Sequence, residues 1–132
     1  MTYKLLLRIA SIAMLVHFLG HTMGHLMWRD TPDAEGVIGA MAGTLFPFMG
    51  TERSFADYYE GFSWFVVLML AAAAVWLWVL SSRPVLDRAL LWPMAIMLLG
   101  FAGIELVYFF PFAAGMSALA GICTVVALVR KS

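Results

Sequence analysis

The chain is poor in charged residues and in cysteine. Only 12% of its 132 residues are charged, with eight Lys and Arg balanced by eight Asp and Glu. A soluble domain usually carries about 25% charged residues. No basic stripe is present, which argues against nucleic acid as a partner. The single cysteine, Cys123, cannot close an internal disulfide, and no Cys/His spacing typical of a zinc finger occurs.

What the chain has in abundance is apolar residues. They make up 64% of the sequence, and the mean hydropathy is +0.93. This excludes disorder, and a small water-soluble fold could not hide so much apolar surface. Runs of about 20 apolar residues can cross a bilayer as helices. Such runs extend from about Leu5 to Met27, Gly61 to Leu80, Ala89 to Phe110 and Phe112 to Val129. We predict an all-α fold, a polytopic membrane four-helix bundle that forms a single domain over residues 1–132.

The first apolar run could be taken for a signal peptide. It is long, carries Arg8 and three histidines, and lacks a small-residue cleavage site, so we interpret it as a retained helix. The Lys and Arg distribution then predicts the orientation. One side would receive Lys4, Arg8, Arg83, Arg88, Arg130 and Lys131, and the other only Arg29 and Arg53. We expect a multi-pass protein of the bacterial inner membrane with both termini in the cytoplasm.

The long loop between the first two runs, residues 28–60, would then lie outside. Asp30-Thr31-Pro32-Asp33 is typical of a turn. Residues 37–49 are apolar but too few to span, and Gly39, Gly43 and Pro47 interrupt them. We expect an interfacial or re-entrant segment there, with an irregular loop as the alternative.

Two polar features interrupt the apolar runs. His17, His21 and His25 lie in the first run, and Glu105 lies in the third. Ionizable residues inside a bilayer are costly and usually face the bundle interior, pair with one another or mark a functional path. A spacing of four places the histidines on one helical face, as a ladder about 12 Å tall. This face is therefore expected to point toward protein.

The positions of these groups suggest a polar funnel that opens to the outside. Gly20 and Gly24 lie beside the ladder and would let a neighbouring backbone come close. Counting residues places His21 and Glu105 at about the same depth. The wall of the funnel would comprise His17, His21, His25 and Glu105. Its mouth would hold Arg53, Asp57 and Glu60, which together with Tyr59 are candidate gate residues.

Several chemistries fit these side chains. The cofactor-binding candidates are His17, His21, His25, Glu105 and Tyr108. Imidazoles and a carboxylate suit Zn, Cu or non-haem iron, and a mononuclear site would use His21, His25 and Glu105. Haem with a histidine ligand, or a lipophilic molecule, is another candidate occupant. His21 and Glu105 could instead act as catalytic acid and base.

Two roles need no cofactor. A ladder of titratable groups suits a proton relay or a transport component. In a scaffold or accessory subunit, the same groups would only join helices. The expected partners are the lipid bilayer and a lipophilic small molecule, and a homo-oligomer with pockets at its interface stays open.

Two segments resemble a family of small bacterial four-span membrane proteins that is itself uncharacterised. One is Met49-Gly50-x-x-Arg53-Ser54-x-x-Asp57-x-Tyr59-x-Gly61-Phe62, and the other is Gly20-His21-Thr22-Met23-Gly24. The resemblance implies the four-span topology and supplies no reaction. The positions that belong to the family pattern are Gly50, Arg53, Asp57, Tyr59, Gly61 and His21. His17 and His25 lie outside the matched segments.

Overall fold

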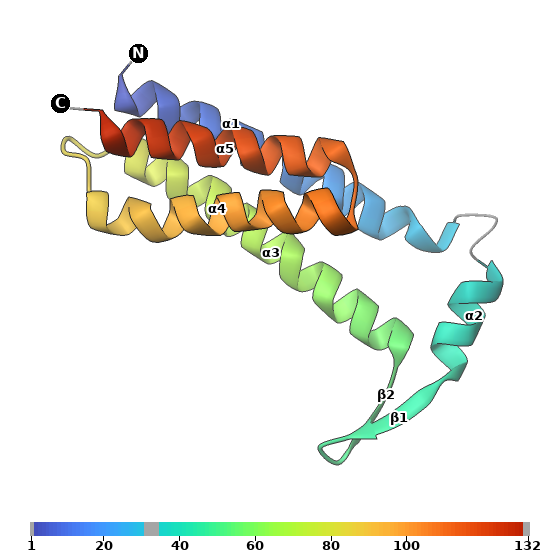
Figure 1. The fold of residues 1–132 in the computed structure, drawn as a ribbon. Helices are drawn as coiled ribbons and strands as arrows, with labels where there is room; N and C mark the ends of the chain where they lie inside the picture. The colour runs from blue at the N-terminus through green and yellow to red at the C-terminus, as the bar shows by residue number, and fades with distance from the viewer. Residues whose placement is uncertain (1, 31–34, 131–132) are drawn as a thin grey trace. The chain divides into compact units, whose positions relative to one another are not determined.

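A computed structural model describes residues 2–30 and 35–130 of the chain (Figure 1). Its elements are α1 (Tyr3–Met27), the short 3-10 helix η1 (Trp28–Asp30), α2 (Glu35–Gly43), β1 (Leu45–Phe48), β2 (Thr51–Ser54), α3 (Phe55–Ser81), α4 (Arg88–Tyr108) and α5 (Pro111–Val129). The predicted all-α class is confirmed. Among the described residues, α1 with η1, α3, α4 and α5 are long and apolar enough to cross a membrane. These four helices correspond to the four predicted runs.

The described residues form two compact units. The first comprises the residues up to Leu19 and those from Leu70 onward, and the second comprises Gly20–Met69. The first unit therefore contains most of α1, the second part of α3, and all of α4 and α5. The second unit contains the end of α1, the hairpin region and the start of α3.

The first unit is a helical bundle in which α4 and α5 lie side by side (Figure 1). Its core consists of large apolar side chains with almost no exposed surface, namely Leu7, Met14, Leu70, Leu77, Leu91 and Leu98. Small residues bring the helices close together. A Cβ atom on Gly121 of α5 would lie 2.7 Å from Cδ2 of Leu99 in α4. The hydroxyl of Ser11 donates to the backbone oxygen of Ala74 over 2.7 Å, which joins α1 to α3.

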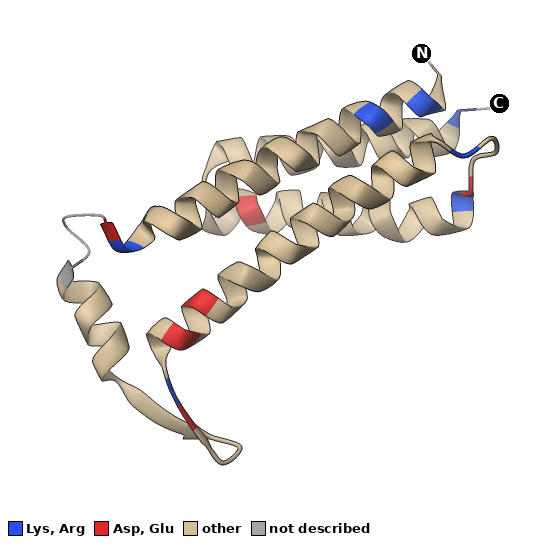
Figure 2. Cartoon of the chain, turned by 180° about the vertical axis from the view of Figure 1, so that it is seen from behind, with Lys and Arg blue, Asp and Glu red and all other residues tan. Residues whose placement is uncertain are grey.

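One end of this unit brings together the start of α1, the α3–α4 loop and the end of α5. The hydroxyl of Tyr3 donates to the backbone oxygens of Arg83 and Pro84, over 2.9 and 3.1 Å. Arg88 donates to the backbone oxygen of Arg130 over 3.1 Å. Figure 2 shows the Lys and Arg residues of the unit gathered at this end. The helix ends are thus grouped as the charge pattern predicts, while Lys131 lies outside the described residues.

Helix ends follow from local sequence. Asp87 caps α4 by accepting a hydrogen bond from the backbone N–H of Leu90, over 3.2 Å. Pro111 occupies the first turn of α5, where its missing N–H costs nothing. The predicted starts of these helices, at Ala89 and Phe112, are one residue late.

The start of α3 differs more from the prediction, because the helix begins at Phe55 rather than near Gly61. Ser54 and Asp57 form a capping box. The backbone N–H and the hydroxyl of Ser54 donate to Oδ2 of Asp57, over 2.8 and 2.9 Å, and the N–H of Asp57 donates to the Ser54 hydroxyl over 3.1 Å. These bonds satisfy N–H groups that a helix start otherwise leaves free. Residues 55–60, which precede the predicted apolar run, are therefore helical.

The second unit contains a β-hairpin that is not predicted from the sequence. β1 and β2 pair in antiparallel register, with Leu45 opposite Ser54 and Phe48 opposite Thr51. The turn residues Met49 and Gly50 both have positive φ, 50° and 81°. Two-residue hairpin turns with positive φ at both positions match the twist of the flanking strands. The predicted segment 37–49 thus divides into α2, β1 and the start of this turn.

Two further predictions concern the same unit. The predicted turn Asp30–Asp33 lies outside the described residues except for Asp30, which ends η1. Nothing lies within 4 Å of the position that a Cβ on Gly24 would occupy. The predicted close approach at Gly20 and Gly24 stays a prediction, whereas Gly121 is a position where the structure shows a close approach.

Candidate functional site

The first unit buries a histidine beside a carboxylate. Nε2 of His17, on α1, lies 3.6 Å from Oε1 of Glu105, on α4. Both residues are buried, with 4% and 8% of their surface exposed. The expectation that an imidazole of the first run meets the acidic group of the third is thereby confirmed for His17.

A serine completes the group from a third helix. The hydroxyl of Ser117, on α5, lies 3.2 Å from Nδ1 of His17, and Ser117 is fully buried. Because a neutral imidazole has one donor and one acceptor nitrogen, Nε2–H can point to the carboxylate while Nδ1 accepts from the serine. We call His17, Glu105 and Ser117 the buried polar cluster. It joins α1, α4 and α5.

The two carboxylate oxygens of Glu105 differ in their surroundings. One of them, Oε2, is buried and has no hydrogen-bond partner within residues 2–30 and 35–130. A buried carboxylate that carries a charge without sufficient partners is strongly disfavoured. One proton beyond the N–H of a neutral imidazole makes the pair neutral overall, whether the carboxyl or the imidazole holds it. The two arrangements are a neutral pair and an ion pair.

The other two histidines belong to the second unit. Nε2 of His21 lies 3.3 Å from the hydroxyl of Ser63 on α3. His25 is buried, and its ring meets the ring of Trp64 edge-on, with centroids 4.5 Å apart. Nδ1 of His25 has no hydrogen-bond partner in the part of the chain that the structure describes. The three-histidine ladder stays a prediction from spacing, because its members divide between the two units.

The predicted equal depth of His21 and Glu105 stays a prediction, because the two residues belong to different units, and the imidazole that the structure places near Glu105 is that of His17. Residue counts give equal depths only when two helices start level and share one tilt. Helices in membrane proteins are commonly tilted by about 20° and packing sets the tilt. Sequence position therefore identifies the helix that contacts Glu105, and the partner within that helix depends on packing.

The structure does not assemble the predicted metal site from the described residues. They contain no group of three or more His, Cys, Asp or Glu side chains arranged to hold a metal ion. Metal binding by His21, His25 and Glu105 and haem ligation by a histidine stay predictions. Tyr108, predicted as a further cofactor contact one turn after Glu105, is 77% exposed.

The predicted gate residues have local partners in the second unit. Asp57 belongs to the capping box of α3. Glu60 accepts a hydrogen bond from the guanidinium of Arg29. The ring of Tyr59 packs on that of Trp28, with centroids 4.6 Å apart. These contacts brace the end of α1 against the start of α3, and the gating role of these residues stays a prediction.

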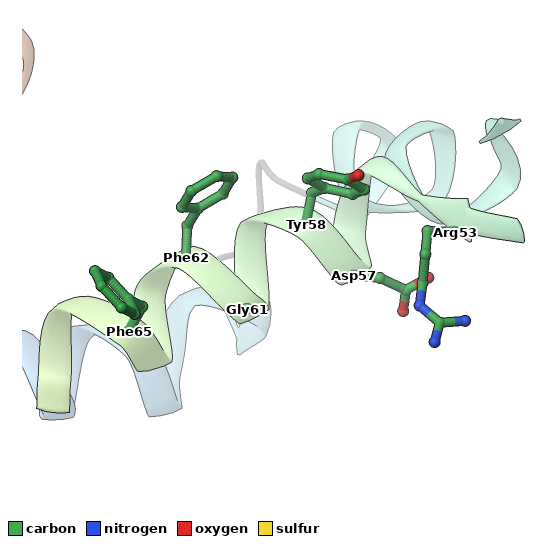
Figure 3. A pocket seen from close by; sticks show the side chains of 6 residues that line it. All are labelled: Arg53, Asp57, Tyr58, Gly61, Phe62 and Phe65. Atoms are coloured by element: carbon green, nitrogen blue, oxygen red, sulfur yellow. The ribbon is translucent and has the colours of Figure 1, made fainter. Parts of the chain in front are cut away.

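A cavity of about 410 Å³ lies beside two of the predicted gate residues. It is lined by Arg53, Asp57, Tyr58, Gly61, Phe62 and Phe65 (Figure 3). All of these residues come from β2 and the start of α3. The lining contains no histidine, so this cavity is not the predicted funnel.

Ser117 is the member of the cluster that the sequence does not predict. A serine in an apolar helix commonly bonds to its own backbone, as the hydroxyl of Thr124 does to the oxygen of Ala120. Only the positions of α1 and α4 distinguish Ser117 from such residues.

Comparison of the chain with family models, with curated proteins and with solved structures gave no match.

Proposed function

We propose that the protein is a proton-relay component of the bacterial inner membrane. It would be a multi-pass protein with both termini in the cytoplasm. Four helices of membrane-spanning length and composition support the location. The basic residues that gather where α1 begins and α5 ends support the orientation, because positive charges are enriched in cytoplasmic segments.

The observation that carries the proposal is the 3.6 Å distance between His17 and Glu105, both buried in the bundle. A buried acid and base at this distance share a proton as a pair rather than titrating separately. Moving the proton from one to the other changes no net charge inside the bundle. The pair can thus accept and pass on a proton without leaving an isolated charge in an apolar interior.

The buried polar cluster suits this role better than the other candidates. Zinc sites take three or four protein ligands, whereas the cluster offers one imidazole and one carboxylate. A group that only fastens helices needs no titratable side chain, since serine and threonine hydroxyls already serve. The unpaired Oε2 of Glu105 is also more than a fastening role requires.

Proton flux into liposomes tests the proposal. Purified protein is reconstituted, a potassium diffusion potential is applied, and an enclosed pH-sensitive dye reports proton entry. We expect flux above that of empty liposomes, and we expect it to be lost in Glu105→Gln and in His17→Asn. Glu60→Gln is the matched control, because Glu60 is a half-exposed carboxylate outside the cluster.

Infrared difference spectra between acidic and alkaline buffer give a second measurement. The C=O band of a protonated carboxyl should change with pH in the wild type and in Glu60→Gln, and part of that change should disappear in Glu105→Gln. If Glu105→Gln keeps both the flux and the whole infrared change, the proposal is wrong and the cluster only links helices.

A further inference from the structure

The cavity at the start of α3 has a charged end and an aromatic end. Figure 3 shows the rings of Tyr58, Phe62 and Phe65 along the helix, with Arg53 and Asp57 at its amino end. Its volume of about 410 Å³ lies in the range of pockets that bind small ligands. The change from charged to apolar lining follows the axis of the helix.

The charged end offers one donor group and one acceptor group. Arg53 uses Nη1 to donate to the backbone oxygen of Glu52, over 2.9 Å, and its side chain is exposed. Asp57 uses Oδ2 for the helix cap, which leaves Oδ1 for a ligand. A guanidinium binds a phosphate through paired N–H groups, and a carboxylate accepts from an ammonium.

The aromatic end is exposed. Phe62 and Phe65 have 67% and 60% of their surface exposed, and both follow Gly61, where the apolar run begins. Apart from the two adjacent residues and the backbone of α3 itself, no atom lies within 4 Å of the position that a Cβ on Gly61 would occupy, so a side chain there would meet open space. In a membrane, rings placed below a charged rim would contact acyl chains.

We propose that this cavity binds phosphatidylethanolamine. Its phosphate would contact Arg53, its ammonium would contact Asp57, and its upper acyl chains would lie on Phe62 and Phe65. One Arg and one Asp give the lining no net charge, which matches a zwitterionic headgroup. An anionic headgroup would meet Asp57 without compensation, and the trimethylammonium of phosphatidylcholine has no N–H to donate. The inference rests on the proposed membrane location and is independent of the proton relay.

Native mass spectrometry in detergent tests this binding. The protein is titrated with phosphatidylethanolamine, phosphatidylcholine and phosphatidylglycerol of identical chains. We expect phosphatidylethanolamine to give the most adduct. Arg53→Gln removes a charge-assisted hydrogen bond and should weaken that adduct about tenfold. Gly61→Leu fills the cavity from an exposed helix position and should abolish the preference. Arg29→Gln is the matched control, since it removes an exposed arginine of the same unit that does not line the cavity.

A charge variant identifies the ammonium contact. Asp57→Asn makes the lining positive and should shift the preference from phosphatidylethanolamine to phosphatidylglycerol. Equal adducts of all three lipids with the wild type would overturn the proposal. So would a preference that survives both Arg53→Gln and Gly61→Leu, with circular dichroism showing both variants folded. Labelling of single cysteines placed at Thr51 in the hairpin and at Ser82 in the α3–α4 loop tests the membrane location separately.

Discussion

His17 and Glu105, from the first and the fourth α-helix of the chain, place an imidazole nitrogen 3.6 Å from a carboxylate oxygen inside a largely apolar bundle. Each group is a titratable side chain buried in a largely apolar interior. Together they need only one proton to be neutral overall. Each residue therefore lowers the free-energy cost of burying the other.

This dependence predicts that the two residues are coupled in stability. His17→Leu removes the imidazole beside the buried carboxyl, and Glu105→Leu removes the carboxyl beside the buried imidazole, so each should lower the free energy of unfolding by about 3 kcal/mol. The double variant should lose less than the sum, because neither partner remains. Unfolding by SDS titration in mixed micelles measures all three. Strictly additive losses would show that the pair is not coupled.

The orientation predicts which loops a membrane-impermeant maleimide reaches. Cys123 is buried and is first replaced by serine to give a background without cysteine. Thr51→Cys, in the hairpin, should be labelled in intact spheroplasts because it would lie outside. Ser82→Cys, in the exposed α3–α4 loop, should be labelled only after lysis. The reverse pattern would refute the orientation, and labelling of both sites in sealed cells would refute the membrane location.

Gly121 and Gly115 lie on the same helix and should respond differently to alanine. A Cβ at Gly121 would come within 2.9 Å of two side-chain atoms of Leu99 and 3.3 Å of its backbone nitrogen. Gly121→Ala should therefore cost about 1–3 kcal/mol through overpacking. Gly115 has open space around it, so Gly115→Ala should be neutral or add up to about 1 kcal/mol of helix stability. Thermal unfolding in detergent compares them, and equal effects would contradict the close approach of α4 and α5.

Ser54 should control the first turn of α3. Ser54→Ala removes the hydroxyl that caps the helix and should cost about 1 kcal/mol. Amide hydrogen exchange of residues 55–57 should accelerate, while exchange in the middle of α3 should stay unchanged. Ser82→Ala is the control, because its hydroxyl donates to the backbone oxygen of Trp78 near the other end of the helix. Unchanged exchange at residues 55–57 in Ser54→Ala would mean that the cap does not hold the helix start.

The long helices could be predicted because their length and apolar composition are properties of single segments. The starts of α4 and α5 could be predicted to within one residue for the same reason. The β-hairpin could not, since its turn uses Met49 where asparagine or aspartate is the usual signal. Hydropathy also does not reveal the early start of α3, because the capping residues Ser54 and Asp57 precede the apolar run.

The candidate site could be predicted only in part. The presence of His17 and Glu105 in apolar runs predicts that they have polar partners, but not which partner each has. That depends on the tilt and rotation of α1 against α4, which no local pattern encodes. Ser117 depends on a third helix as well, so nothing in its own neighbourhood distinguishes it.

The bond from the Tyr3 hydroxyl to the α3–α4 loop has a consequence for biosynthesis. Tyr3 leaves the ribosome 80 residues before Arg83, its partner. The hydroxyl of Tyr3 can therefore reach this partner only after α2 and α3 have been made. The contact can form once the α3–α4 loop has been made, and it would then hold the start of α1 at that loop while α4 and α5 follow.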